Sequence, residues 1–475
     1  MPTGSLKPPW RCTRTNPVSA LPTAPARETT GHLLLRAWCV FILVLALGGV
    51  GLVNAVGPTA AGVVTVASAV VSAVLWIVVR PPVAVRRLPW LAFAYIAWAG
   101  ASIGWSAWPA ASVLTWLLLA VTSFQGLFIG AVLSWRDVVR AIASAAKWVV
   151  GLSLLFEIAV SLLVRGPLLP GFVVPVERVD PVAYWSGDNL LDGGRIQGVF
   201  GNAHLLAAVM LVAIIVFAVR LAAGAPRRAL LVGWIAVAAF LFVRAGSATA
   251  FIAAGFVALV LATVLVMRTA RRPGERTRWY VLYAAIGLGG AAAVWFGRDA
   301  LFGMLGREAD LTGLEGIWAD VIARADQHPL IGWGFSTPWI ASEPLIDGWI
   351  IHHGQTVVQA HSMWLDVFLQ LGGVGVALLT LVYLAYLWRS WFFAVDRPRW
   401  DLRADRPYSP LALLPTLIGA LLVVIGITES GPLLLWGWMF VVLFGGKIKQ
   451  SPLVGVGPSE QSLSIERGEL LRTSS

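Results

Sequence analysis

Long apolar stretches, separated by short polar segments, run along most of the chain. About twelve of them reach or approach the roughly 20 residues that a helix needs to cross a bilayer. They lie near residues 34–54, 59–79, 89–106, 112–134, 142–164, 203–219, 229–244, 248–267, 279–297, 361–388, 411–428 and 431–445. This pattern predicts an all-α polytopic membrane protein with about twelve transmembrane helices within residues 33–445, the first of them an uncleaved anchor.

Four polar segments stand outside these stretches. Residues 1–32 and 446–475 carry too little apolar surface to order themselves, so we expect two disordered tails there. Segments 165–202 and 298–360 are long enough to fold over a membrane surface. Loops of that length commonly carry function, so candidate chemistry is sought there first.

Segment 298–360 contains the pattern of an amphipathic helix. Apolar residues recur at steps of three and four, namely Leu311, Leu314, Ile317, Trp318, Val321, Ile322 and Ala325. Thr312 and Glu315 have the spacing of a capping box, and Pro329 with Gly332 would end the helix. We expect this helix to lie along the membrane interface.

Lys and Arg are distributed unevenly among the loops, which predicts the orientation of the chain. The tails, alternate short loops and Lys147 together hold 28 of the 35 basic residues. The other seven are Arg165, Arg178, Arg195, Arg244, Arg298, Arg307 and Arg324. By the positive-inside rule both termini are predicted to be cytoplasmic, with segments 165–202 and 298–360 on the outer face of the inner (plasma) membrane.

Composition supports the membrane class and excludes others. With 58% hydrophobic and 12% charged residues, the chain has more apolar surface than a soluble core could hide. The net charge of +11 does not gather on one soluble face, so nucleic acid is not predicted as a partner. Cys12 lies in the polar tail and Cys39 in the first apolar stretch, so neither a disulfide nor a zinc site is expected.

Three segments at the predicted outer face carry a recognisable pattern. They are GRIQGVFGNAHLLA (194–207), GREADLTGLEGIWADVIARADQHPLIGWGF (306–335) and AHSMWLDVFLQLGGVGVALL (360–379). Together they resemble the O-antigen ligase and polymerase family, over about residues 190–390. That family has a glycine-rich segment before a helix, an LTGR-x-x-I-W segment ending in H-P-x-x-G-x-G-F, and an A-H-N helix start.

The resemblance implies an inverting, membrane-embedded glycosyltransferase. Such an enzyme moves a glycan from undecaprenyl diphosphate onto an acceptor hydroxyl of a glycan or lipid, without nucleotide sugar, metal or other cofactor. Membrane lipids are the remaining expected partners. The residues fit this chemistry, because a diphosphate leaving group needs charge neutralisation more than a proton, and the guanidinium fork of Arg suits it. No D-x-D pair occurs in either long outer segment to hold a metal for the diphosphate.

Arg195 and Asn202 are the first candidate substrate-binding residues. Arg195 precedes a Gly-rich stretch that leads through Asn202 into the helix predicted from 203, whose amide groups could also face a phosphate. The structural alternative for Arg195 is a side chain that snorkels to the headgroup level.

Arg307 and Arg324 are two further candidates for the diphosphate. Leu314 stands where LTGR has its Arg, so either Arg307 supplies that charge or the protein is a variant with altered activity. Arg324 follows Asp320 by four residues and alternatively forms a surface ion pair with it.

His361 is the predicted catalytic residue, because it matches the family's catalytic His at the outer start of a helix. An imidazole can accept a proton from an acceptor hydroxyl at neutral pH, as a general base. The alternative is an interfacial His that only bonds the loop. Ser362 replaces the family's Asn, and Asp366 lies about 140° around the helix, so it is not the orienting partner.

Other polar residues receive structural interpretations. His352 and His353 are read as solvated loop residues, and His204 as a polar group at a helix start. Glu157 lies inside an apolar stretch, where a carboxylate is costly unless it is paired or faces a cavity. Glu429 and Ser430 are read as a cap in a tight outer turn.

Three other functions remain open from the sequence. A repeat-unit polymerase would use the same donor chemistry with another acceptor. A lipid-linked oligosaccharide flippase or transporter would need a polar central cavity and usually two related halves, which the sequence does not show. A non-catalytic scaffold would be consistent with Leu314.

Overall fold

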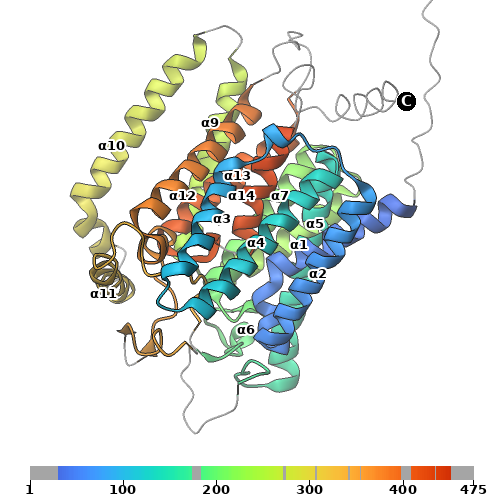
Figure 1. Cartoon of the computed structure of the whole chain (residues 1–475). Coiled ribbons are helices and arrows are strands. Elements are labelled where there is room, and N and C mark those ends of the chain that lie inside the picture. Colours follow the sequence, from blue (N-terminus) through green and yellow to red (C-terminus); the bar gives the residue numbers. More distant parts are fainter. Residues whose placement is uncertain are drawn as a thin grey trace, which may run out of the picture.

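The computed structural model describes residues 30–173, 183–270, 274–304, 308–340, 343–352, 355–396, 408–433 and 435–450, and it is a bundle of helices (Figure 1). The long helices are α1 Thr30–Val56, α2 Pro58–Val79, α3 Trp90–Ala101, α4 Pro109–Val132, α5 Trp135–Ala159, α7 Ala203–Ala222, α8 Arg228–Ala245, α9 Ala248–Thr269, α10 Glu275–Met304, α11 Glu308–Ala325, α12 Met363–Val395, α13 Leu414–Thr428 and α14 Leu435–Gln450. Helix α6 Asn189–Asp192 is one turn long, and strands β1 Ile351–His352 and β2 Gln355–Thr356 form a small antiparallel pair. The predicted all-α class is confirmed.

Nine of the described helices are long and apolar enough to cross a membrane, so the predicted count of twelve is not confirmed. They are α1, α2, α4, α5, α7, α8, α9, α12 and α13. The other three predicted spans correspond to α3, α10 and α14. Of these, α3 has 12 residues and α14 has 16, and the side chains in the second half of α10 lie outside the described set.

The predicted tails fall almost entirely outside the described residues. Their inner edges, residues 30–32 and 446–450, belong to α1 and α14 and are helical. The domain boundaries at 33 and 445 therefore remain predictions, displaced by a few residues from the ends of the described bundle.

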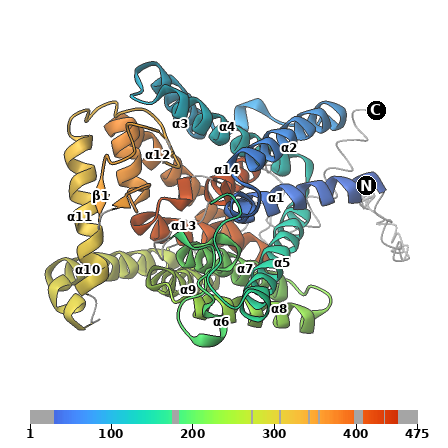
Figure 2. The same cartoon turned by 90° about the horizontal axis from the view of Figure 1, so that it is seen from below.

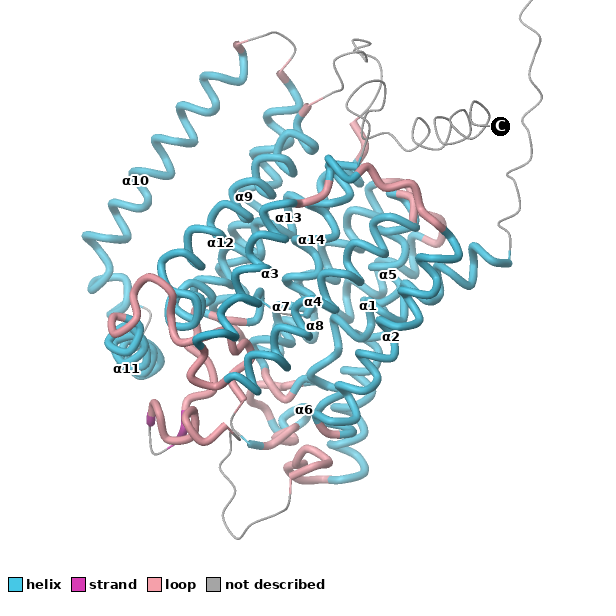
Figure 3. The backbone as a smooth tube through the Cα atoms, in the orientation of Figure 1, coloured by secondary structure: helices cyan, strands magenta, loops and turns pink. Residues whose placement is uncertain are grey.

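Hydrogen bonds show which helix ends lie together. At one end, Lys449 donates to the Leu88 carbonyl, Lys447 to Gly130 and Leu133, and Arg268 to Ala394. We call this the basic end, because Arg80, Arg86, Arg87, Arg136, Arg140, Arg220, Arg227, Arg228, Arg276, Arg278 and Arg389 also belong to the helix ends and short loops there. The opposite end is the loop end, where most of the described loop structure gathers (Figure 3).

Helices α13, α14 and α7 form the centre of the bundle (Figure 2). About 78% of the residues in the apolar stretch that contains α13 are buried, and 67% in that of α7, against 11% for α2 and 28% for α8. The outer helices expose Val, Leu and Ile side chains such as Val66, Val70 and Ile77 of α2. An apolar exterior of this kind suits contact with lipid rather than water.

The amphipathic helix predicted in the long loop is present as α11. It begins at Glu308, four residues before the expected Thr312, and its buried stripe contains Ile317, Val321 and Ala325. Figure 1 looks along α11, whereas the bundle helices run across the view, so α11 crosses the bundle direction at the loop end.

The loop after α11 is fixed to a break in α12. The Trp333 and Gly334 amides donate to the Leu369 and Gln370 carbonyls, and the Gly373 amide donates to Pro329. Gly372 has φ 62° and ψ −166°, and a Cβ there would lie 2.2 Å from the Leu330 carbonyl carbon. Only glycine permits both this conformation and this approach.

Candidate active site

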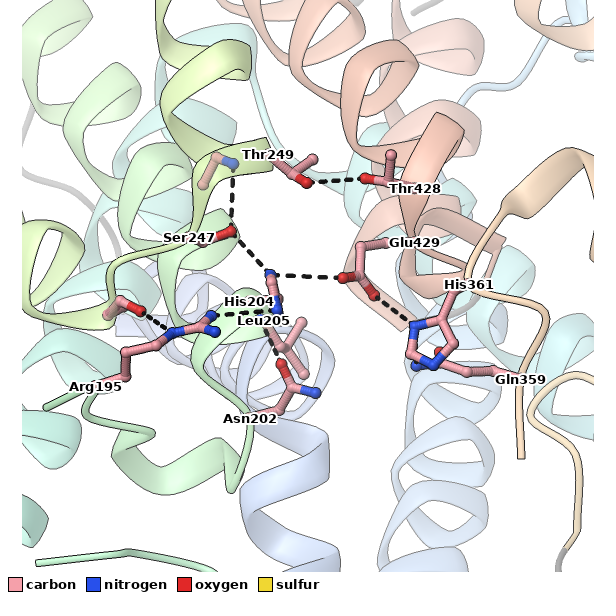
Figure 4. A network of polar contacts seen from close by, with 12 residues as sticks. Arg195, Asn202, His204, Leu205, Ser247, Thr249, Gln359, His361, Thr428 and Glu429 are labelled. Carbon is pink, nitrogen blue, oxygen red and sulfur yellow. Dashed lines mark hydrogen bonds and ion pairs between the residues drawn. The ribbon is translucent and has the colours of Figure 1, made fainter. Parts of the chain in front are cut away.

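Four side chains at the loop end form one chain of polar contacts, which we call the polar network: Arg195, His204, Glu429 and His361 (Figure 4). They come from the segment before α7, the first turn of α7, the turn after α13 and the residue before the α12 cap. The structure therefore brings together Arg195 and His361, the two residues that sequence analysis ranked first.

Arg195 is exposed and is held at the end of α8. Its Nε donates to the Ala245 carbonyl at 3.0 Å, and its Nη2 lies 3.2 Å from Nε2 of His204. Ala245 is the last residue of α8, where helix carbonyls concentrate negative potential and favour a cation. The guanidinium is thus oriented by backbone while part of its fork stays available to a ligand.

The segment that carries Arg195 is anchored by Glu157 of α5. This carboxylate is fully buried, and its Oε1 accepts the Gln197 and Gly198 amides at 2.9 and 2.6 Å. Its Oε2 accepts the Ser186 hydroxyl at 3.1 Å. The costly carboxylate noted in the sequence is therefore satisfied by backbone donors and positions the loop.

Asn202 caps α7. Its side-chain oxygen accepts the Leu205 amide at 3.0 Å, as expected of an N-cap residue. Because the cap fixes where α7 starts, His204 in the first turn of the helix lies next to Arg195.

His204 receives a defined protonation state from its neighbours. Arg195 can only donate, so Nε2 of His204 must accept, and its Nδ1 carries the proton toward the Ser247 hydroxyl at 3.0 Å. Oε1 of Glu429 lies 3.7 Å from the same Nδ1. His204 is therefore the neutral link between the arginine and the carboxylate.

Glu429 stands between the two histidines. Its Oε1 faces His204, and its Oε2 lies 4.0 Å from Nδ1 of His361. Burial raises the pKa of Glu429 to about 7, although the charge of Arg195 acts in the opposite direction. The carboxyl can therefore change its charge near neutral pH.

His361 adopts a left-handed backbone conformation, with φ 49°, just before the Ser362 cap of α12. Its contacts with described residues all involve Nδ1, which faces Glu429 and lies 3.2 Å from Nε2 of Gln359. This leaves the Nε2 edge for a substrate. Burial lowers the pKa of His361 below its ordinary value, so the ring is neutral at pH 7.

The other predicted site residues lie elsewhere or outside the described part. The Arg324 guanidinium donates to the Trp349 carbonyl and lies over the Trp349 ring at 5.2 Å, so it holds the long loop together. Arg307 and His353 are not among the described residues. Leu314 is a half-buried member of α11.

The roles of Glu429 and His204 do not follow from the sequence alone. Glu429 was interpreted as a turn cap and His204 as a polar helix start. The available signal was a lone carboxylate in a short outer turn between two apolar stretches.

Asp366, which was excluded as the partner of His361, is buried on α12 and accepts from Gln370 at 3.4 Å. Within the described residues no group of three His, Cys, Asp or Glu side chains could hold a metal ion.

The central part of the chain is similar to known proteins. Residues 233–380, from α8 into α12, match the O-antigen ligase family, and this range includes His361 but not Arg195, His204 or Glu429. The exopolysaccharide production protein ExoQ of Rhizobium meliloti is 30% identical over 155 residues, which are 30% of this chain. The match spans about a third, 34%, of that relative's length. Over its central region, residues 233–380, this membrane protein is therefore similar to the O-antigen ligase family.

Proposed function

We propose that the protein is a glycosyltransferase of polysaccharide assembly, which moves a glycan from a polyprenyl diphosphate carrier to an acceptor hydroxyl. The observation that carries this proposal is the polar network, in which the exposed guanidinium of Arg195 and the neutral imidazole of His361 are linked through His204 and the carboxylate of Glu429. The family resemblance suggests undecaprenyl diphosphate as the carrier.

Arg195 is proposed to bind the diphosphate of the donor. Its guanidinium is exposed, fixed at one nitrogen by the Ala245 carbonyl, and therefore preorganised for a phosphate oxygen. The first amides of α7, next to the Asn202 cap, add a favourable helix dipole for an anion. Arg307 stays in the proposal as a second contact on sequence grounds, whereas the bonds of Arg324 to Trp349 favour a structural role for it.

His361 is proposed to be the general base. With the ring proton on Nδ1, toward Glu429, and the Gln359 amide turned so that its oxygen accepts from Nδ1, Nε2 is free to act as the base. It takes the proton of the acceptor hydroxyl while the acceptor oxygen forms a bond to the anomeric carbon. The bond from that carbon to the diphosphate oxygen breaks, and its electron pair leaves with the diphosphate. Glu429 then faces an imidazolium and stabilises it by charge.

The placement of the two groups supports inversion. Figure 4 shows Arg195 and His361 on either side of Glu429. A diphosphate bound by the arginine and an acceptor hydroxyl bound by the histidine would then lie on opposite sides of the anomeric carbon. Attack opposite to the leaving group inverts the anomeric configuration.

The basic end is proposed to face the cytoplasm, because the positive-inside rule places loops rich in arginine there. The polar network then lies on the outer face of the inner membrane, with both termini inside. Ligation of a finished glycan and polymerisation of repeat units both fit, because they share the donor chemistry; the relative is named for exopolysaccharide production.

Purified full-length protein should transfer glycan from a lipid-linked donor, also in the presence of a chelator. We expect His361→Ala to lower the rate by at least about a hundredfold, since general bases commonly contribute that much. Arg195→Lys should mainly raise the donor KM, because it keeps the charge but loses the fork.

His32→Ala is the matched control, since His32 lies at the basic end beside Asp137, far from the polar network. It should retain the wild-type rate. Full transfer by the His361→Ala protein would refute the assignment of the base. Carrier flipping without any transfer would instead indicate a flippase, and a lack of both activities would favour a scaffold.

A further inference from the structure

A groove opens at the basic end of the bundle, remote from the polar network. Its lining comes from the start of α3, from residues between Val382 and Arg389 of α12, and from residues between Val441 and Lys449 of α14. Apolar side chains, among them Leu91, Val382 and Val441, form the wall of the groove. Tyr386 also lines the groove. Its hydroxyl donates to the Pro415 carbonyl, so its aromatic ring and not its hydroxyl contributes to the wall.

Two cations stand at the rim of the groove, Arg389 of α12 and Lys449 of α14. Arg389 is exposed, and none of its contacts with described residues is a hydrogen bond or an ion pair. Lys449 donates to the Leu88 carbonyl and lies near enough to Arg389 for the two positive charges to repel each other. No acidic residue is among the described residues that line the groove.

Two cations that have no acidic partner among the described residues, above an apolar wall, are complementary to an amphiphile with an anionic head. The groove lies at the ends of α3, α12 and α14, and therefore at the depth where lipid headgroups meet the hydrocarbon. Basic pockets between transmembrane helices are known to bind acidic lipid headgroups. Trp90, which is 52% exposed at the rim, suits the same interfacial position.

We propose that this groove is a specific site for an anionic phospholipid, with its phosphate between Arg389 and Lys449 and an acyl chain along Leu91 and Val441. The site is independent of the transfer chemistry, because it lies at the opposite end of the bundle from His361. Lipid in this groove would join α3, α12 and α14 at their basic ends.

The test is native mass spectrometry of the full-length protein in detergent, titrated with phosphatidylglycerol or with phosphatidylcholine of the same acyl chains. We expect one phosphatidylglycerol to bind about tenfold more tightly than phosphatidylcholine. The Arg389→Gln, Lys449→Gln double variant should lose this preference, because amides keep the size of the side chains but not their charge.

Arg228→Gln is the matched control, because Arg228 is an exposed arginine at the same end of the bundle on α8. Helix α8 lies across the bundle from α3 (Figure 2). Equal loss of preference in this control, or none in the double variant, would overturn the proposal. Displacement of phosphatidylglycerol by equimolar inorganic phosphate would also overturn it, since the site would then recognise a free anion and not a lipid.

Discussion

Glu429 has one oxygen facing each histidine of the polar network, so its charge affects both sides of the candidate site. Burial raises the pKa of Glu429 to about 7 and lowers that of His361. As the pH falls, the Glu429 carboxylate becomes protonated first, near pH 7, and loses its negative charge. The His361 imidazole becomes protonated at a lower pH and can then no longer accept a proton.

The transfer rate of the wild type should accordingly fall as the pH drops below about 7. In Glu429→Gln this inflection should disappear, and the remaining decline should follow His361 at lower pH. At pH 8 the variant should be at least about fivefold slower, because a carboxylate about 4 Å away stabilises an imidazolium by roughly 1 kcal/mol or more. A pH–rate profile of both proteins measures this.

Thermal unfolding separates this role from a structural one. A carboxyl whose pKa is higher in the folded than in the unfolded state costs stability once it ionises, here increasingly from about pH 4.5 to about pH 7. Glu429→Gln should therefore be at least as heat-stable as the wild type at pH 8. A marked loss of stability would show that Glu429 supports the fold instead.

Arg195 and His361 could be selected from the sequence because each stands in a recognisable motif, Arg195 before a Gly-rich stretch and His361 at a predicted helix start. Glu429 and His204 could not be assigned in the same way. Their significance depends on contacts between α7 and the turn after α13, and such contacts depend on how the helices pack. The role of Glu157 was hidden for the same reason, since its partners lie in another segment.

At the scale of elements, hydropathy located the helices but not all of their ends. Helix α5 begins at Trp135 rather than near 142, because the Ser134 hydroxyl accepts the Asp137 amide and starts the helix in a polar stretch. A hydropathy window detects only the apolar part of such a helix. The kink at Gly372 was equally invisible, because a Leu-Gly-Gly sequence inside an apolar stretch does not reveal which residue leaves the helical conformation.

The kink in α12 gives a prediction for the long loop. Gly372→Ala should destabilise the protein and release the loop, because its Cβ would lie 2.2 Å from the Leu330 carbonyl carbon at a positive φ. We expect a lower melting temperature and faster proteolysis within residues 329–350.

Gly373→Ala is the neighbouring control. A Cβ at Gly373 would meet the Pro329 oxygen at 3.4 Å, which is an ordinary contact, and Gly373 is not among the residues with positive φ. Its melting temperature should stay within a few degrees of the wild type. Similar behaviour of the two variants would refute the proposed fixing of the loop by Gly372.

At the scale of the whole molecule, the basic end and the loop end can be distinguished experimentally. In a protein with Cys12→Ser and Cys39→Ser, a cysteine replacing Leu345 in the long loop should react with an impermeant thiol reagent added to intact cells. A cysteine replacing Val85 at the basic end should react only after permeabilisation. Both positions are well exposed, at 55% and 62%. Labelling in the reverse pattern would place the site in the cytoplasm.

Of the four members of the polar network, Arg195 and His204 precede the family-matched region, His361 lies within it, and Glu429 follows it. A chimera that exchanged only residues 233–380 with a relative would import the histidine at 361 but retain its partners from the original host. A chimera meant to transfer sugar or acceptor preference should therefore exchange the whole segment from before α6 to after the turn that follows α13. The donor-binding Arg195 and the acceptor-binding His361 then come from the same protein.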